Sequence, residues 1–233
     1  QLENFQKVLA KMREKYPTEI VDVIPSAPLI APGGSQFMSI WAFWPITKVV
    51  ATDEQLAEID QLISEGRIIG AYAQTEIAHG SDVQSLATTA HYDPETKTFT
   101  LNTPSTSAYK YWPGGMGVCC THVVCQAQTY VKGKHCGLQT FVVPVRDPKT
   151  LKPYPGLDIG DIGKKLGLNE IDNGYLKFDN YKIPFKSMLS RFFKINENGD
   201  IIEKGDKDAI KLGYGGMLNL RNLLILNFVL ESY

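Results

Sequence analysis

The sequence predicts an α+β fold in which helices come first, a long block of strands follows, and a further helix begins near Leu212. Two observations support this order. Near the start of the chain, apolar residues recur at steps of three and four, which is typical of an amphipathic helix. From Ile68 onward the pattern changes to an alternation of period two, which indicates strands. Helices and strands are thus segregated along the chain, as in α+β proteins.

Two helical blocks precede the strands. Residues 2–15 carry the first apolar stripe, and a connector rich in Pro and Gly follows at 16–34. The second block covers about 36–66. Within it, Thr52 is a predicted N-cap and Gln55 stands at the third helical position, where its side chain can complete a capping box.

The clearest strand signal is a hairpin. Residues 86–92 and 98–102 alternate Thr with apolar side chains, and Asp93-Pro94-Glu95-Thr96 forms the turn between them. Further strands are predicted at 118–130, 138–145 and 174–178, because turn signals separate these apolar runs.

Composition excludes several classes of function. Lys and Arg (24) balance Asp and Glu (25), so we expect no broad positive surface for nucleic acid. No apolar stretch is long and uninterrupted enough to predict a membrane-spanning helix. The four cysteines, Cys119, Cys120, Cys125 and Cys136, form no C-x-x-C pair, so we expect no metal site and interpret them as reduced structural residues. Adjacent Cys119 and Cys120 would point to opposite faces of a strand.

The segment 67–82 begins as a strand and ends in a polar turn, Thr75-Glu76 followed by His79-Gly80-Ser81-Asp82. Such a turn presents backbone N–H groups and hydroxyls that can hold a pyrophosphate or the polar edge of a flavin. The same residues are also ordinary turn chemistry, so the segment alone leaves both interpretations open.

Three motifs together resemble the acyl-CoA oxidases of the acyl-CoA dehydrogenase and oxidase superfamily. The first is Tyr72-Ala73-Gln74-Thr75-Glu76 with His79-Gly80, and the second is Lys110-Tyr111-Trp112-Pro113-Gly114-Gly115-Met116-Gly117. The third combines 160–163 with 170–180. The resemblance implies a central antiparallel β-barrel or sandwich between an N-terminal helical segment and the start of a C-terminal helical domain. It also implies that His79 is a structural part of its turn.

The resemblance assigns roles to five residues. Thr75 is similar to the residue that hydrogen-bonds the flavin of FAD, and Gly114 to the close backbone approach to the same ring; the two are 39 positions apart (114 − 75), as in the family. Trp112 resembles a residue lining the cofactor, although a core Trp is an equal alternative. Ser81, where oxidases more often carry Thr, and the helix residue Arg221 correspond to contacts with acyl-CoA, although a solvated Arg explains the latter equally well.

The implied organisation has three parts: a helical segment at 1–66, a β-domain that binds flavin and acyl-CoA at 67–185, and a connector with a first C-terminal helix at 186–233. The family's catalytic Glu belongs to the later helical domain, so we expect no catalytic residue in this chain, and we expect the sequence to be part of something longer.

Three functions follow from the resemblance. The first is an FAD-dependent acyl-CoA oxidase of fatty acid β-oxidation that forms trans-2-enoyl-CoA and hydrogen peroxide. The second is a truncated, catalytically silent relative that serves as a structural subunit of a larger complex, in which a mitochondrial setting stays open. The third is an acyl-CoA dehydrogenase. For the oxidase we expect acyl-CoA as substrate, a homodimer or larger assembly, and the peroxisome as location, although no targeting signal is visible.

Overall fold

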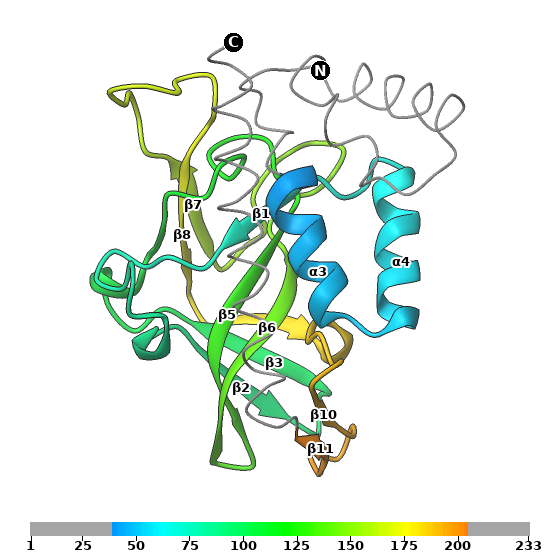
Figure 1. Cartoon of the computed structure of the whole chain (residues 1–233). Helices are drawn as coiled ribbons and strands as arrows, with labels where there is room; N and C mark the ends of the chain where they lie inside the picture. Colours follow the sequence, from blue (N-terminus) through cyan, green and yellow to red (C-terminus); the bar gives the residue numbers. More distant parts are fainter. Residues whose placement is uncertain (1–38, 205–233) are drawn as a thin grey trace.

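The structure is a computed structural model that describes residues 39–204 of the 233-residue chain. Its helical elements are a π-helical turn at Ser39–Phe43, α3 at Trp44–Val50 and α4 at Asp53–Ser64. The strands are β1 Gly70–Ala73, β2 Thr89–Asp93, β3 Thr98–Asn102, β4 Lys110–Tyr111, β5 His122–Val131, β6 Lys134–Pro144, β7 Leu157–Asp161, β8 Gly174–Phe178, β9 Tyr181–Pro184, β10 Phe193–Ile195 and β11 Ile201–Lys204. Short 3-10 turns lie at Val83–Ser85, Thr106–Ala108 and Phe185–Ser187. The two helices lie side by side against the strands (Figure 1).

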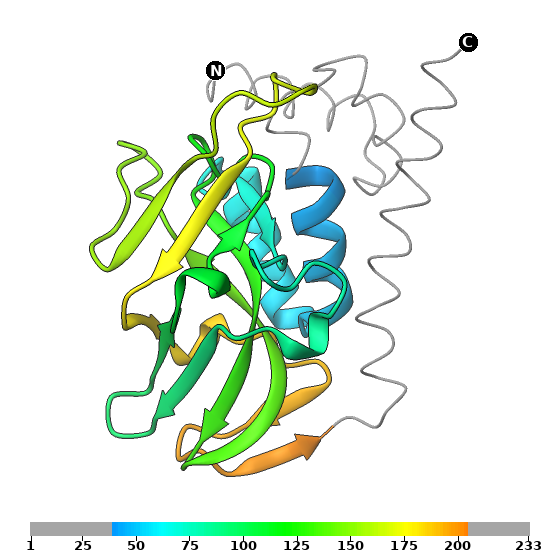
Figure 2. The same ribbon diagram turned by 90° about the vertical axis from the view of Figure 1, so that its left-hand side faces the viewer.

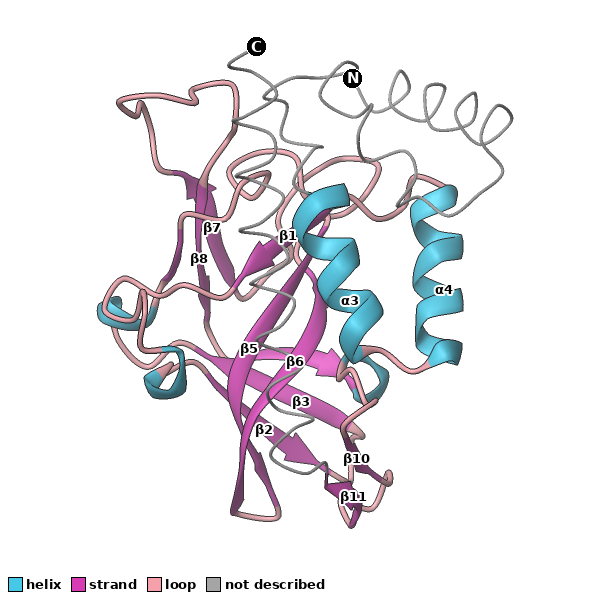
Figure 3. Ribbon diagram, in the orientation of Figure 1, coloured by secondary structure: helices cyan, strands magenta, loops and turns pink. Residues whose placement is uncertain are grey.

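The largest sheet is built around β5. Strand β6 pairs antiparallel along the whole of one edge of β5. Strands β1 and β2 share the other edge and both run parallel to β5, with Gly70 opposite His122 and Thr89 opposite Gln128. The sheet continues through β3 to β9. A three-stranded sheet β4-β8-β7 and the two-stranded β10-β11 complete the fold, and the strands curl around a common interior (Figures 2 and 3).

Alternation along β5 separates two apolar cores. Val123 and Cys125 face the interior of the curled sheets, where they join buried residues from most of the other strands. Val124, between them, faces the opposite way and packs with Phe43 and Ile59 beneath the helices. This follows from the period of two in a strand, and it explains why β5 is apolar on both faces at this point.

The helices are fixed to the sheet at Gly70. Its backbone N–H donates to the hydroxyl of Ser39 at 2.8 Å. A Cβ at this position would lie 2.0 Å from Cγ of Phe43. The missing side chain of Gly70 therefore makes room for the buried Phe43 ring, and strand β1 can lie directly against the π-helical turn.

The predicted helix cap is confirmed. The Thr52 hydroxyl accepts from the backbone N–H of Gln55 at 3.3 Å, and the Gln55 side chain accepts from the Thr52 N–H at 3.1 Å. The Gln55 amide also donates to the Met188 carbonyl at 2.8 Å and accepts from the Ser190 N–H at 3.0 Å. The capping residue thus also ties α4 to the chain that follows β9.

The predicted α+β order is confirmed, and so are the hairpin, as β2 and β3, and the strand at 174–178, as β8. The sheet differs from a purely antiparallel one in the two parallel pairings of β5. These pairings join segments about fifty and forty residues apart, beyond the reach of any local turn signal.

One predicted strand was wrong in its first part. The apolar run at 118–130 becomes a strand only at His122, because the turn at 114–119 includes its first two residues and residues 120–121 lie outside any strand. The N–H groups of Val118 and Cys119 donate to the Asp172 carboxylate instead of to a neighbouring strand. Cys119 and Cys120 therefore do not lie on opposite faces of a strand.

All four cysteines are free thiols, as expected. Burial raises the pKa of Cys120 and of Cys125 to about 12, which keeps both thiols protonated and poorly reactive.

The helices predicted at 2–15 and near Leu212 lie outside the described residues. The division at residues 66 and 185 stays a prediction. Within residues 39–204, no helix is both long enough and apolar enough to cross a bilayer.

Candidate functional site

The turn after β1 lies directly against β4. The backbone N–H of Tyr111 donates to the Thr75 carbonyl at 3.0 Å, and the N–H of Ile77 donates to the Tyr109 carbonyl at 3.1 Å. Because Trp112 follows Tyr111, these bonds place Thr75 beside the start of the second motif. The two motifs that stand 39 positions apart in sequence (114 − 75) are therefore neighbours in space.

Thr75 is half-buried, and among residues 39–204 its hydroxyl makes no hydrogen bond. A half-buried hydroxyl without a protein partner can donate to, or accept from, a bound molecule. This is the property that a flavin contact requires.

Trp112 has an unusual backbone. Its φ is +84°, in the left-handed region that side chains other than Gly rarely adopt. Two hydrogen bonds hold it there: its N–H donates to the Gly174 carbonyl at 3.0 Å, and the Asn173 amide donates to its carbonyl at 2.5 Å. The side chain is 54% exposed, and its ring meets the Tyr111 ring edge-on at 5.6 Å between centroids. The core alternative for Trp112 is therefore wrong, and a strained backbone here presents an indole at the surface.

Gly114 is buried within the turn that follows Trp112. Two charged side chains hold this turn from different sides. The Asp172 carboxylate accepts from the N–H groups of Val118 and Cys119 at 2.7 and 3.1 Å. The buried Arg146 guanidinium donates to the Gly117 carbonyl at 2.9 Å. These bonds hold the backbone at 117–119, directly after Gly114, in place, which suits a close backbone approach to a ring.

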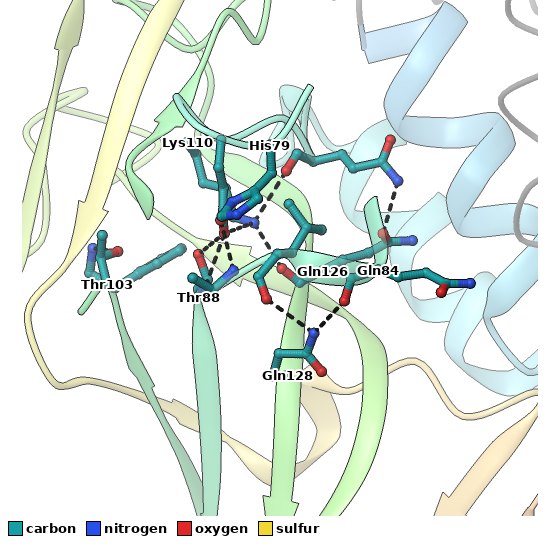
Figure 4. Close-up of polar contacts among 12 residues, drawn as sticks. His79, Gln84, Thr88, Thr103, Lys110, Gln126 and Gln128 are labelled. Carbon is teal, nitrogen blue, oxygen red and sulfur yellow. Dashed lines mark hydrogen bonds and ion pairs between the residues drawn. The ribbon is translucent and has the colours of Figure 1, made fainter. Parts of the chain in front are cut away.

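Ser81 lies beyond the turn and is exposed. Its loop is attached to β5 through the Gln128 amide, which donates to the carbonyls of Gln84 and Leu86 at 2.9 and 3.0 Å (Figure 4). The structure therefore places the segment of Thr75 beside the segment that carries Trp112 and Gly114, and leaves Ser81 exposed on the loop that follows. Arg221 lies outside the described residues.

Beneath the turn lies a buried ion pair to which the sequence analysis gave no role. Glu76 Oε1 lies 3.0 Å from Lys110 Nζ, and neither side chain is exposed. The Glu76 carboxylate also accepts from the Thr88 hydroxyl at 2.6 Å and from the Ala87 N–H at 2.8 Å. His79 completes the set, with Nδ1 at 2.9 Å from Glu76 Oε2. Figure 4 shows Lys110, His79 and Thr88 converging on this point.

These partners decide the ionisation of Glu76. Burial alone would raise the pKa of the carboxyl, but the Lys110 ammonium and the donors of Ala87 and Thr88 outweigh burial and lower the pKa to about 2. The carboxylate is charged at neutral pH and its lone pairs are occupied. In the sequence the two residues stand inside the two motifs, Glu76 in the first and Lys110 in the second, and no local pattern marks them as buried partners.

Comparison with known proteins agrees with this geometry. The family model for the acyl-CoA dehydrogenase middle domain matches residues 71–181. Peroxisomal acyl-coenzyme A oxidase 1 of Homo sapiens is 47% identical over 165 residues, which are 70% of this chain and 24% of that protein. The chain spans about a quarter of the length of the curated relatives it matches.

Solved structures give the same result. Acyl-CoA oxidase 1 of Arabidopsis thaliana has a TM-score of 0.75 and 39% identity, over 81% of this chain and 29% of that one. Acyl-CoA oxidase-1 of Caenorhabditis elegans, complexed with FAD and ATP, has a TM-score of 0.75 and 38% identity, over 88% of this chain and 32% of that one.

The described strands and the paired motifs define an acyl-CoA dehydrogenase-type middle domain. Within that class, the chain belongs to the acyl-CoA oxidase family, which is a flavoprotein family. The family resemblance expected from the sequence is confirmed, as is the fold class.

Proposed function

We propose that the protein containing this chain is an FAD-dependent acyl-CoA oxidase of fatty acid β-oxidation, which forms trans-2-enoyl-CoA and hydrogen peroxide. The observation that carries the proposal is the hydrogen bond between the Tyr111 N–H and the Thr75 carbonyl. This bond supports the proposal because it joins the segment of Thr75, whose hydroxyl has no hydrogen-bond partner among residues 39–204, to the segment that carries the exposed Trp112 and the Gly114 turn. A planar ring with a polar edge, such as a flavin, fits such a surface.

The residues fit FAD on chemical grounds. In the proposal, the Thr75 hydroxyl hydrogen-bonds the polar edge of the ring, the Gly114 backbone lies close to the ring, and the Trp112 indole lines it. When bound, FAD supplies the acceptor for the hydride that leaves the β-carbon of the acyl group. This chain's own contribution is to bind and orient, and Asp172 and Arg146 keep the Gly114 turn in place for that purpose.

Acyl-CoA is the proposed substrate, held by Ser81 and by Arg221. Ser81 is exposed on the loop that follows the Thr75 turn, so its hydroxyl is accessible to a thioester arm. Glu76 is unsuited to be the base that removes the α-proton, because a carboxylate with a pKa of about 2 and occupied lone pairs is a weak proton acceptor at neutral pH. As the family resemblance implies, the base of the reaction is proposed to lie outside this chain.

Location and assembly are part of the same proposal. The human relative described above is named a peroxisomal oxidase, so we place this protein in the peroxisome. A homodimer or larger assembly is proposed from the family resemblance alone. The division into 1–66, 67–185 and 186–233 belongs to the proposal as well.

The test is spectroscopic. The full-length native protein should carry flavin absorbance that bleaches when acyl-CoA is added without oxygen, and that returns in air together with hydrogen peroxide. Flavin that bleaches but does not return in air would favour an acyl-CoA dehydrogenase. A native protein without flavin would contradict both enzymes and leave the structural-subunit function.

A further inference from the structure

The Glu76–Lys110 ion pair lies where the two motifs of the candidate site meet. Glu76 directly follows Thr75, and Lys110 precedes Trp112 by two positions. The distance of 3.0 Å between Oε1 and Nζ therefore joins the segment that carries the proposed flavin hydroxyl to the segment that carries the proposed flavin-lining indole.

The pair is also anchored to the sheet. Lys110 Nζ donates to the Gln126 carbonyl on β5 at 3.0 Å and to the Gln74 carbonyl at 3.3 Å. On the other side, the Glu76 carboxylate accepts from both the N–H and the hydroxyl of Thr88, the residue directly before β2. Displacing either motif would break several charge-assisted hydrogen bonds inside the protein.

One carboxylate also closes the Thr75 turn. Glu76 and His79 exchange backbone hydrogen bonds at 3.0 and 3.2 Å, and the His79 ring is bound to the Glu76 carboxylate. Because an ionised carboxylate only accepts hydrogen bonds, Nδ1 of His79 carries the proton. The turn that leads toward Ser81 is thus attached to the same group that holds Lys110.

We propose that Glu76 and Lys110 are positioning residues of the flavin site, which set the place of Thr75 relative to Trp112 and Gly114. The inference rests on the proposed function. Stability alone does not explain the pair, because well-packed apolar side chains of the same volume often serve a fold equally well. A network of directed hydrogen bonds also fixes the segment that carries Thr75 relative to the segment that carries Trp112. An apolar pair, which has no directional contacts, does not do this.

The test uses the full-length native protein, stripped of flavin and reconstituted with FAD. Glu76→Gln keeps the shape of the side chain and removes its charge. We expect the dissociation constant for FAD to rise by about tenfold or more. The visible absorption bands of the bound flavin should also shift, because its surroundings change. Glu58→Gln is the matched control, since Glu58 on α4 forms an exposed ion pair with Lys186 of the 3-10 turn after β9. It should leave both readouts unchanged.

A second variant separates positioning from folding. Glu76→Gln combined with Lys110→Met leaves no unpaired charge in the interior, so it should recover most of the thermal stability that the single change removes. If the pair positions the site, this stable variant still binds FAD at least about tenfold more weakly than wild type, with shifted flavin bands.

The outcomes are distinct. A stable double variant with wild-type FAD affinity and spectrum overturns the inference and leaves the proposed function standing. If neither variant folds, Glu76 and Lys110 serve the stability of the fold alone, and the inference is overturned in this case too. Absence of FAD from the native wild-type protein overturns the proposed function, and this inference with it.

Discussion

The Asp172 carboxylate accepts a hydrogen bond from the backbone N–H of Val118 at 2.7 Å. The same oxygen accepts from the Cys119 N–H at 3.1 Å. This one side chain ties the loop before β8 to the glycine turn that carries Gly114, over a separation of 54 positions (172 − 118).

Removing that carboxylate should loosen the glycine turn. We expect Asp172→Ala to lower the free energy of unfolding by about 1–3 kcal/mol, because two backbone donors lose a charged acceptor. Asp172→Asn should cost less, since an amide oxygen can take the same place. Urea denaturation measures both. The control is Asp179→Ala, which removes an exposed carboxylate whose one hydrogen bond within residues 39–204 comes from the Asn180 amide. Equal free energies of unfolding for Asp172→Ala and wild type would contradict the claim that the Asp172 carboxylate holds the glycine turn in place.

Gly174 should tolerate no larger side chain. A Cβ there would lie 2.5 Å from the Gly117 nitrogen and 2.6 Å from the Met116 carbonyl carbon. Both are backbone atoms that cannot rotate away, so the cost of Gly174→Ala should reach about 1–3 kcal/mol or more. Because Gly174 exchanges backbone hydrogen bonds with Trp112 and Pro113, retention of FAD should fall as well.

The matched control for this change is Gly167→Ala, where a Cβ would meet no atom within 4 Å. It should leave the midpoint of urea denaturation unchanged. The steric argument is refuted if both substitutions have the same small effect.

Much of this fold could be predicted because its signals are local. The Thr52–Gln55 cap and the β2–β3 hairpin each depend on residues within a few positions of one another. By contrast, β4 has only two residues, and β7 has only five, with Gly160 between Ile159 and Asp161. Neither is long enough to carry a clear periodic pattern, and both are strands through their pairing with β8.

The same distinction applies to the site. The motif spacing predicted that Thr75 and Gly114 belong together, and their segments do lie together. The burial of Glu76 and Lys110 could not be predicted, because charged residues are normally exposed. Each can be buried only because the other lies 3.0 Å away, and the partner is 34 positions distant in the sequence.

Thr75 offers a direct test of the flavin contact. Thr75→Val keeps the branched shape and removes the hydroxyl, so FAD affinity should fall by about 0.5–1.5 kcal/mol, or roughly two- to twelvefold in the dissociation constant. Thr75→Ser retains the hydroxyl and should bind FAD nearly as wild type does. Thr100→Val on β3 is the control for a strand hydroxyl away from the motifs. Unchanged affinity in Thr75→Val would remove Thr75 from the site.

His122, the first residue of β5, should make stability depend on pH. Burial lowers the pKa of its imidazole to about 4, and the nearby Arg67 acts in the same direction. In the unfolded chain the pKa is near the ordinary value for histidine, 6.5. Between pH 6.5 and 4 the unfolded chain therefore binds a proton that the folded chain does not. Stability falls as the pH drops through this window, by at most about 1.4 kcal/mol per pH unit from this group.

His122→Asn should make stability depend less on pH, because Asn does not titrate. In the wild type, Nδ1 of His122 lies 3.0 Å from the Thr121 hydroxyl, and the Asn amide can take its place as the partner of that hydroxyl. The exposed His135 gives the control His135→Asn, which should keep the wild-type slope. Urea midpoints between pH 6.5 and 4.5 measure both. The protonation of Glu76 lies outside this range. The stability that ionised Glu76 contributes is fully present above its pKa in the unfolded chain, 4.5, and is lost only as the pH falls from there toward 2. If His122→Asn and wild type lose stability in parallel across the range, another group causes the acid sensitivity.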